Sequence, residues 1–294
     1  MKHGMKRDRF ELLDGILFAF LVIYALLILV PFYNVIVVSF TSQKEFMTTS
    51  VLLFPKEPTL RSYVDLYKDG RVLIGYRTTL ILLVMSLPLN IIMTTCLSYG
   101  MSRPRFPGKK PIMLMLVFTM VFNGGIIPMY MLMKQMKLIN TLWSVVLSTG
   151  INTFYMIIMR NYFESISESL VESARLDGAS EMCILTRIIL PLSTPIIATV
   201  TLFYAVDRWN EWYYSMIFIR KANITPLQLI LRNMITNSKV LDEIAASGGS
   251  VEDVQFSMGI KMGAVMVSML PIMCVFPFLQ RYFVKGIMVG AIKS

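Results

Sequence analysis

Long apolar stretches alternate with short polar segments along the whole chain. A transmembrane helix needs ~20 mostly apolar residues, and six stretches of the sequence meet this requirement. They are residues 13–39, 72–100, 111–133, 142–159, 191–219 and 258–283. The pattern predicts an all-α integral membrane protein whose six transmembrane helices form one domain of residues 12–294, after a short segment of residues 1–11.

Several of the predicted spans contain residues that interrupt helices. These residues are Pro31, Pro88, Gly124, Gly125, Pro128, Pro195, Pro271 and Pro277. Such interruptions are tolerated in a membrane where neighbouring helices or a water-filled cavity satisfy the freed backbone groups. They favour a multi-helix assembly with a pathway over a simple anchor, although ordinary packing kinks explain any single one equally well.

The basic residues predict how the chain crosses the membrane, because Lys and Arg are enriched in cytoplasmic loops. Half of the 28 basic residues lie in the connections expected inside: Lys2, Lys6, Arg7, Arg9, Arg103, Arg105, Lys109, Lys110, Arg160, Arg175, Arg187, Arg281, Lys285 and Lys293. The two long outside loops also carry basic residues, but acidic residues accompany them there, and long loops count less in this rule. With six spans, this distribution places both termini in the cytoplasm of a bacterial cell and the long loops 41–71 and 220–255 outside. The first apolar run is too long for the core of a cleaved signal peptide.

Composition and charge exclude several classes of protein. Only 16% of the residues are charged, whereas a soluble domain carries ~25%. The net charge of +10 comes from basic residues that flank apolar runs, so lipid headgroups rather than nucleic acid are the expected partners. The three cysteines share no metal-ligand spacing and His3 is the single histidine. We therefore expect no metal site, no catalytic triad and no enzymatic activity.

The polar segment of residues 161–190, between the fourth and fifth predicted spans, has the features of a helix. Ser167 or Ser169 can cap its N-terminus, and Ser169 with Glu172 has the spacing of a capping box. Three apolar side chains are expected to share one side of this helix: Leu170, Val171 and Ala174.

Gly178 is placed to end this helix, because glycine readily adopts the positive φ of a helix C-terminus. Ser180 can then cap a second helix that runs into the next span at Pro191. Small residues around the turn would let another surface approach closely. By periodicity alone, an amphipathic helix that packs on lipid headgroups explains the segment equally well.

Residues 172–191 resemble a signature of binding-protein-dependent ABC importer permeases, EAA-x-x-x-G-(x)9-I-x-LP. Residues 172–179 read ESARLDGA, and Ile188 and Pro191 fall on signature positions, while Ser173 replaces an alanine by another small residue. The resemblance implies a coupling helix that docks in a cleft of an ATPase subunit. It assigns to this contact Glu172, Ser173, Ala174, Asp177, Gly178, Ala179 and Pro191.

Three further segments resemble carbohydrate permeases of the lipo-oligosaccharide, alginate and maltose types, in particular their second permease subunit. They are residues 122–130, 209–212 and 277–293. The resemblance implies an importer of a sugar or oligosaccharide that an extracellular solute-binding protein delivers. It also implies a second homologous permease subunit and two ATPase subunits, which bind ATP and Mg in place of this chain.

Polar and aromatic residues within the third and fifth predicted spans are candidates for the cargo pathway. Sugars are recognised by aromatic faces and hydrogen-bonding side chains, and polar groups inside a membrane are expensive enough to suggest a function. The candidates are Asn210, Trp209, Asn123, Tyr130, Glu211 and Tyr213. The aromatic residues would equally suit an interfacial belt.

Other functions remain open at this point. The permease could carry a solute other than a sugar, or the chain could be an ion-coupled secondary transporter. Secondary transporters usually show inverted repeats and intramembrane acids, and neither is clear here. The sequence contains no GxxxxGK[ST] phosphate-binding loop, so ATP hydrolysis is expected on partner subunits.

Overall fold

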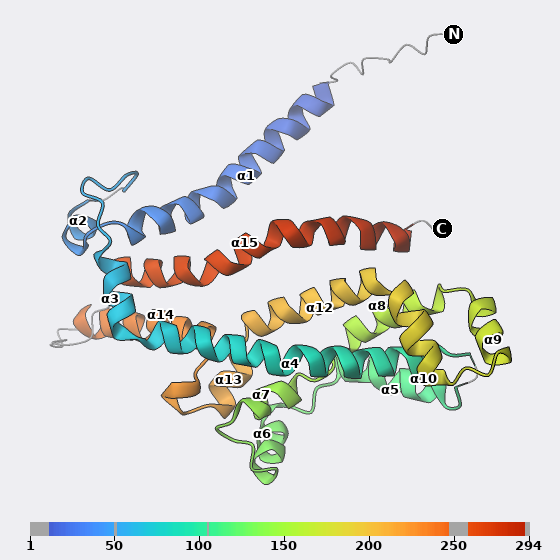
Figure 1. The fold of residues 1–294 in the computed structure, drawn as a ribbon. Helices are drawn as coiled ribbons and strands as arrows, with labels where there is room; N and C mark the ends of the chain where they lie inside the picture. The colour runs from blue at the N-terminus through green and yellow to red at the C-terminus, as the bar shows by residue number, and fades with distance from the viewer. Residues whose placement is uncertain (1–11, 50–51, 105, 247–257, 292–294) are drawn as a thin grey trace, which may run out of the picture. The chain divides into compact units, whose positions relative to one another are not determined.

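A computed structural model describes residues 12–49, 52–104, 106–246 and 258–291 (Figure 1). Every regular element among these residues is a helix, which confirms the predicted all-α class. The chain divides into two compact units, Met1–Asp69 with Ser238–Val267 and Gly70–Asn237 with Ser268–Ser294. The basic segment of residues 1–11 and the end of the 277–293 motif lie outside the described residues.

The first unit is built on close packing of small residues. Its elements are α1 (Leu12–Ser39), α2 (Gln43–Thr48), α3 (Arg61–Asp69) and parts of α14 (Leu227–Ala246) and α15 (Met258–Ala291). A Cβ atom at Gly259 would lie 2.5 Å from Ser62 Oγ and 3.2 Å from the carbonyl oxygen of Thr41. Gly259 therefore lets α15 approach α3 closely, as small residues do between membrane helices.

The second unit is organised around three helices that pack against one another: α4 (Arg71–Ser102), α8 (Thr153–Glu164) and α12 (Thr194–Trp209). Side chains also link α4 to α8. Ser98 Oγ donates to the carbonyl of Met156 at 3.0 Å. The shorter elements of this unit are α5 (Lys109–Val121), α6 (Ile126–Gln135), α7 (Leu142–Ser148), α9 (Glu168–Leu176), α10 (Glu181–Ile184), the π-helical turn Leu185–Ile189, α11 (Leu190–Leu192), α13 (Tyr213–Phe218) and the 3-10 turn Ala222–Ile224. Within the unit, α9 lies at the opposite end from α13 (Figure 1).

Three described helices are long and apolar enough to cross a membrane: Asp14–Ser39, Arg71–Ser102 and Met258–Val275. Three further pairs of helices qualify jointly, but they bend by 112° between α5 and α6, 52° between α7 and α8, and 83° between Leu192 and Thr194. Six spans result where each pair counts as one. With 13 residues, α5 extends only ~20 Å and is too short to cross a ~30 Å hydrocarbon layer by itself.

The predicted interruptions have different effects. Gly124 and Gly125 coincide with the sharpest bend, and Gly125 has a φ of 89° that favours glycine. Pro31 and Pro88 instead lie inside the continuous helices α1 and α4. Pro195 lies in the first turn of α12, where its missing N–H would have no helical partner in any case.

The break between α7 and α8 is closed by buried side chains of the neighbouring helices. Asn90 of α4 donates from Nδ2 to the carbonyls of Thr149 at 2.8 Å and Gly150 at 2.7 Å. On the other side, the Tyr204 hydroxyl of α12 accepts from the N–H of Asn152 at 2.9 Å. These bonds satisfy backbone groups that hydrocarbon would leave without partners.

We predict that Asn90→Leu destabilises the protein, because it leaves two buried carbonyls without their donor at a cost of about 2 kcal/mol or more. The midpoint of thermal unfolding in detergent should fall by about 5 °C. Met93→Leu is the matched control on the same helix, since it conserves volume and removes no hydrogen bond. Equal midpoints for the two variants would show that the break does not depend on Asn90.

Candidate functional site

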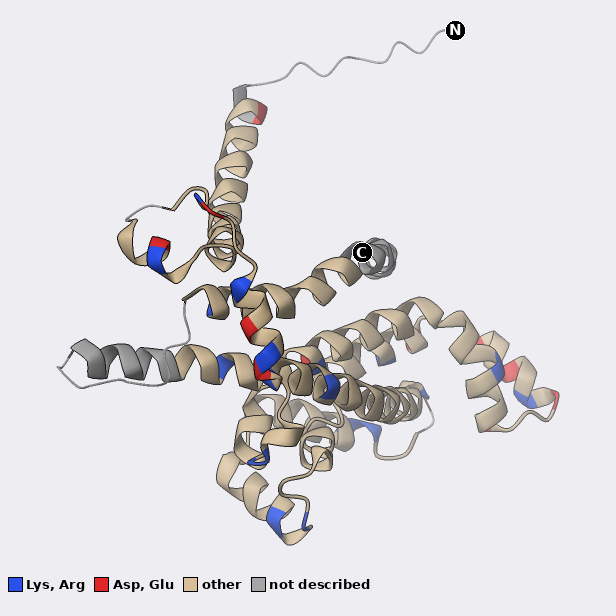
Figure 2. Cartoon of the chain, turned by 60° about the vertical axis from the view of Figure 1, so that its left-hand side comes forward, with Lys and Arg blue, Asp and Glu red and all other residues tan. Residues whose placement is uncertain are grey.

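The loop between α8 and α12 carries acidic and basic residues close together, whereas charges are sparse along the long helices of the second unit (Figure 2). Within this loop α9 begins at Glu168, one residue after Ser167. The predicted side-chain cap is wrong: Ser167 makes no capping bond, and its hydroxyl pairs with that of Ser169 at 2.7 Å. Ser169 already lies in the first turn, so the predicted capping box with Glu172 does not form.

A single fully buried side chain attaches α9 to the rest of the unit. Val171 is 1% exposed and packs in a core with Phe163 and Ile184. Ala174 is partly buried against the same core. Leu170 is 49% exposed, so the prediction that it shares the buried side is wrong: each residue advances ~100° around a helix, which turns Leu170 away from the core.

The end of α9 follows the prediction. Gly178 has a φ of 83°. Its N–H donates to the carbonyl of Arg175 at 3.0 Å, and the N–H of Ala179 donates to that of Ala174 at 2.9 Å. This pair of bonds is the Schellman motif, which satisfies the last carbonyls of a helix.

The second helix also begins as predicted. Ser180 Oγ accepts from the N–H of Cys183 at 3.3 Å and caps α10. The chain continues through the π-helical turn and α11, where Pro191 is exposed, before the 83° bend into α12.

The surface of α9 that faces away from the core is polar with an apolar end. Glu172, Ser173 and Asp177 are exposed beside Gly178. Leu176 is 89% exposed, an unusual environment for leucine. Leu176 was not among the predicted site residues, although its five-residue separation from the buried Val171 turns it about 140° away on a helix.

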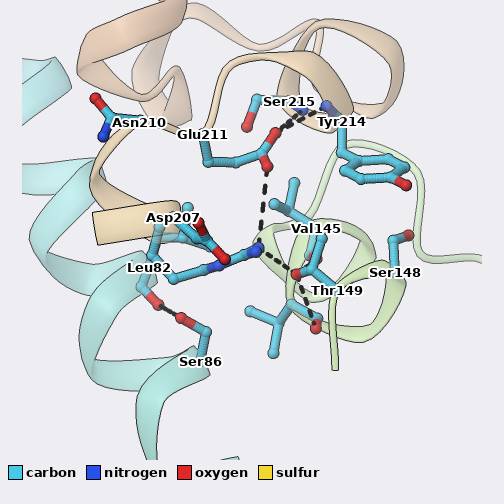
Figure 3. A network of polar contacts seen from close by, with 12 residues as sticks. Leu82, Ser86, Val145, Ser148, Thr149, Asp207, Asn210, Glu211, Tyr214 and Ser215 are labelled. Atoms are coloured by element: carbon cyan, nitrogen blue, oxygen red, sulfur yellow. Dashed lines mark hydrogen bonds and ion pairs between the residues drawn. The ribbon is translucent and has the colours of Figure 1, made fainter. Parts of the chain in front are cut away.

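The fifth predicted span contains a buried ion pair (Figure 3). Arg208 is 5% exposed and Glu211 is 8% exposed, and Nη1 of the arginine lies 3.9 Å from Oε2 of the glutamate. Arg208 also donates to Thr149 Oγ1, at the break of the fourth span. The second carboxylate oxygen of Glu211 accepts from the N–H groups of Tyr214 at 2.8 Å and Ser215 at 3.3 Å. Glu211 therefore caps α13.

Asp207 and Trp209 border an open apolar pocket of about 640 Å³ lined by residues of α4, α8, α12 and α15, with Phe203 and Pro271 also in its wall. Asp207 Oδ2 accepts from the hydroxyl of Tyr155 at 3.0 Å. Trp209 Nε1 donates to the carbonyl of Ser268 at 3.2 Å. Both polar groups are thus bonded within the protein, and the pocket offers mainly apolar surface.

The two tyrosine candidates, Tyr130 and Tyr213, belong to one row of aromatic side chains. Tyr130 stacks on Phe218 with ring centroids 6.3 Å apart. Phe218 stacks on Tyr214 at 6.0 Å, and Tyr214 contacts Tyr213 at 5.3 Å. This aromatic row joins two of the predicted candidates, Tyr130 and Tyr213.

The two asparagine candidates are both exposed and lie on different elements. Asn210 ends α12, where its Nδ2 donates to the carbonyl of Val206 at 2.9 Å and its Oδ1 accepts from Gln228 at 3.5 Å. Asn123 Oδ1 accepts from the N–H of Gly125 at 2.9 Å, within the bend between α5 and α6. Among the described contacts, none joins Asn123 to the fifth-span residues.

Long apolar helices, a break closed by buried polar groups and an exposed helical loop are features of an α-helical membrane protein. Residues 71–289 match the family of binding-protein-dependent transport system inner membrane components, and the chain belongs to this family.

Relatives extend the similarity along nearly the whole chain. The polygalacturonan/rhamnogalacturonan transport system permease protein of Bacillus subtilis (strain 168) is 33% identical over 285 residues, which cover 97% of this chain and 99% of that protein. The arabinooligosaccharides transport system permease protein of Halalkalibacterium halodurans is 24% identical over 295 residues, covering 99% and 100%. A solved bacterial ABC transporter involved in the import of the acidic polysaccharide alginate contains a similar chain, with a TM-score of 0.81 and 29% identity over 96% of this chain and 100% of that one. The family consists of transporter permeases and not of enzymes.

We predict that Arg208→Leu or Glu211→Gln alone destabilises the protein more than the two changes together. Each single variant leaves one buried charge without its partner, which costs about 3–5 kcal/mol. In the double variant, the amide oxygen of the introduced glutamine can still accept from the α13 N–H groups. Thermal unfolding of the three variants in detergent checks this, and strictly additive losses would contradict it.

We also predict that Gly178→Ala loosens α9 without a steric clash. No atom lies within 4 Å of the Cβ position at Gly178, so the cost of about 1–2 kcal/mol arises from the positive φ alone. Gly178→Asn should be milder, because asparagine tolerates this conformation better. Amide hydrogen exchange in α9 should rise in the order wild type, Asn variant, Ala variant, and the reverse order of the two variants would contradict the assignment.

Proposed function

We propose that this chain is the membrane-spanning permease subunit of an ATP-driven importer, and that its cargo is a sugar or oligosaccharide delivered by an extracellular solute-binding protein. The observation that carries the proposal is the exposed α9 helix with its signature residues. Glu172, Ser173 and Asp177 are exposed and available to a partner. The small residues Ala174, Gly178 and Ala179 let that partner approach closely, although the two alanines also pack partly on the core of the unit. Pro191 begins the connection to the fifth span.

In this proposal the chain works with several partners. Two ATPase subunits bind ATP and Mg and receive α9 in a cleft, and a second homologous permease subunit completes the pathway. ATP binding closes the ATPase subunits and moves α9, which shifts the permease pair between inward-facing and outward-facing packings. Such a change is a population shift driven by a ligand that favours one state.

The orientation of the chain is part of the same proposal. Residues 12–294 form the six-span permease domain, and the basic segment 1–11 and both termini lie in the cytoplasm with loop 161–190. Arg160 of α8, Arg175 of α9 and Arg187 of the π-helical turn support this arrangement, because cytoplasmic loops are enriched in Lys and Arg.

The relatives and the aromatic row support a carbohydrate cargo. The relatives' names specify polygalacturonan, rhamnogalacturonan and arabinooligosaccharides, and the similar solved chain belongs to an alginate importer. Pyranose rings present apolar C–H faces, so they stack on aromatic side chains such as Tyr130 and Tyr213. Asn210, Trp209, Asn123 and Glu211 are the polar or amphipathic candidates beside or beyond this row.

The test uses the transporter reconstituted in proteoliposomes with its partner subunits and binding protein. Glu172→Lys should reduce ATP-driven uptake and sugar-stimulated ATP hydrolysis at least tenfold, since a charge reversal on the docking surface costs ~1.4 kcal/mol or more. Insertion into the membrane should be unchanged, because Glu172 is exposed. The charge-preserving Glu172→Asp variant should retain most of both activities.

Unchanged stimulated ATPase in Glu172→Lys would contradict the proposed docking. Uptake that follows an imposed proton or sodium gradient without ATP would indicate a secondary transporter instead. A panel of polygalacturonan, alginate and arabinan fragments, with an amino acid for comparison, tests the class of cargo; selective uptake of the non-sugar would overturn the carbohydrate assignment.

A further inference from the structure

One carboxylate joins the exposed loop to the end of α4. Glu181 is the first residue of α10, and its Oε2 accepts from the hydroxyl of Tyr99 at 2.6 Å. Its Oε1 accepts from Nε of Arg175 at 2.9 Å and lies 2.7 Å from Nη2 of the same arginine. Tyr99 belongs to the last turn of α4 and Arg175 to the last turn of α9. The two oxygens of Glu181 thus contact two different helices.

The other attachment of α9 to the spans is apolar packing in the core that also contains Tyr99 and Phe163. Val171 is the buried residue of α9. The turn at Gly178 has open space at its Cβ position and a backbone conformation that glycine adopts freely. The contact between Arg175 and Glu181 crosses this turn and links the residues on its two sides.

The two contacts of Glu181 differ in strength. The side chains of Arg175 and Glu181 are 30% and 55% exposed, and exposed ion pairs contribute little. The bond from Tyr99 is short and charge-assisted, and its donor residue is 8% exposed, so this contact is the stronger of the two. The guanidinium of Arg103, 4.6 Å from the centroid of the Tyr99 ring, further fixes this tyrosine.

The helix α4, which Glu181 contacts through Tyr99, also carries the polar residue at the break of the fourth span. Asn90, which closes the break of the fourth span, lies on α4 about 13 Å along the axis from Tyr99 at 1.5 Å per residue. A displacement of α9 that moves Tyr99 therefore also moves Asn90, because α4 is a continuous helix between these two residues.

We propose that Glu181 is a positioning residue that couples the movement of α9 to α4 during transport, with the Tyr99 hydroxyl as its partner. The proposal rests on the proposed function, because it requires α9 to be moved by an ATPase. It predicts that removing the bond weakens the coupling of ATP hydrolysis to sugar uptake, while the transporter still folds and assembles.

The experiment measures uptake and ATP hydrolysis together in proteoliposomes that contain the complete transporter with Tyr99→Phe or Glu181→Ala. The amount of sugar imported per ATP hydrolysed should fall about fivefold. A fully buried charge-assisted bond would have a larger effect, but water reaches the Glu181 carboxylate and weakens this one. The ATPase subunits should still co-purify, and the unfolding midpoint should match wild type. The double variant should show the same ratio as Glu181→Ala alone, since the alanine already removes the bond from Tyr99.

Tyr162→Phe is the matched control, because it removes a hydroxyl that donates to the carbonyl of Leu192 at 3.3 Å near the same loop. It should leave the sugar-to-ATP ratio at the wild-type value. A wild-type sugar-to-ATP ratio in Tyr99→Phe would overturn the proposal. The proposal would also fail if the decreases in this ratio added up in the double variant and were accompanied by a lower midpoint of thermal unfolding. Absence of ATP-driven sugar uptake in the wild-type transporter would instead contradict the proposed function.

Discussion

Backbone groups in hydrocarbon have no water to bond, so every interruption of a membrane helix needs a donor or acceptor from the protein itself. The second unit meets this constraint at the break of the fourth span with Asn90 from one side and Tyr204 from the other. Tyr204 also pairs with Thr94 of α4 at 2.8 Å. The same polar contacts that close the break therefore fix the spacing of α4, α8 and α12, and the other features of the unit are arranged around them.

The constraint also changes how the polar residues of the fifth span are interpreted. Arg208 and Glu211 are buried and form an ion pair; Arg208 also donates to the Thr149 hydroxyl at the break, and Glu211 accepts from the backbone N–H groups at the start of α13. Asn210 and Tyr213, by contrast, are exposed. A polar residue in a membrane segment can therefore either hold the fold together or remain available for another contact. A residue that is buried and has bonding partners belongs to the first group.

The features that the sequence predicted best are local ones. Apolar runs placed the long helices, and Gly178 and Ser180 ended and began helices as expected because each acts through its own backbone surroundings. The 52° bend was beyond prediction, since the side chains that close it lie far along the chain. The 83° bend lies just before Pro195, which the sequence had marked as an interruption.

The cap at Ser167 failed for a related reason: two adjacent hydroxyls satisfied each other, and no pattern distinguishes that outcome from a capping bond. Asn90 could have been noticed as an amide within an apolar run. Its partners at Thr149 and Gly150 could not have been predicted without the fold. The same holds for Glu211, whose capping of α13 requires the chain to turn back after Asn210.

The break of the fourth span has a consequence for how the chain is made. Asn90 precedes the break in the sequence, but Tyr204 follows Asn152 by 52 residues. At a synthesis rate of ~5–20 residues per second, the N–H of Asn152 waits roughly 3–10 s for its partner to emerge from the ribosome. During that interval the fourth segment is incomplete as a membrane helix, so the fourth and fifth segments gain stability by entering the bilayer as a pair.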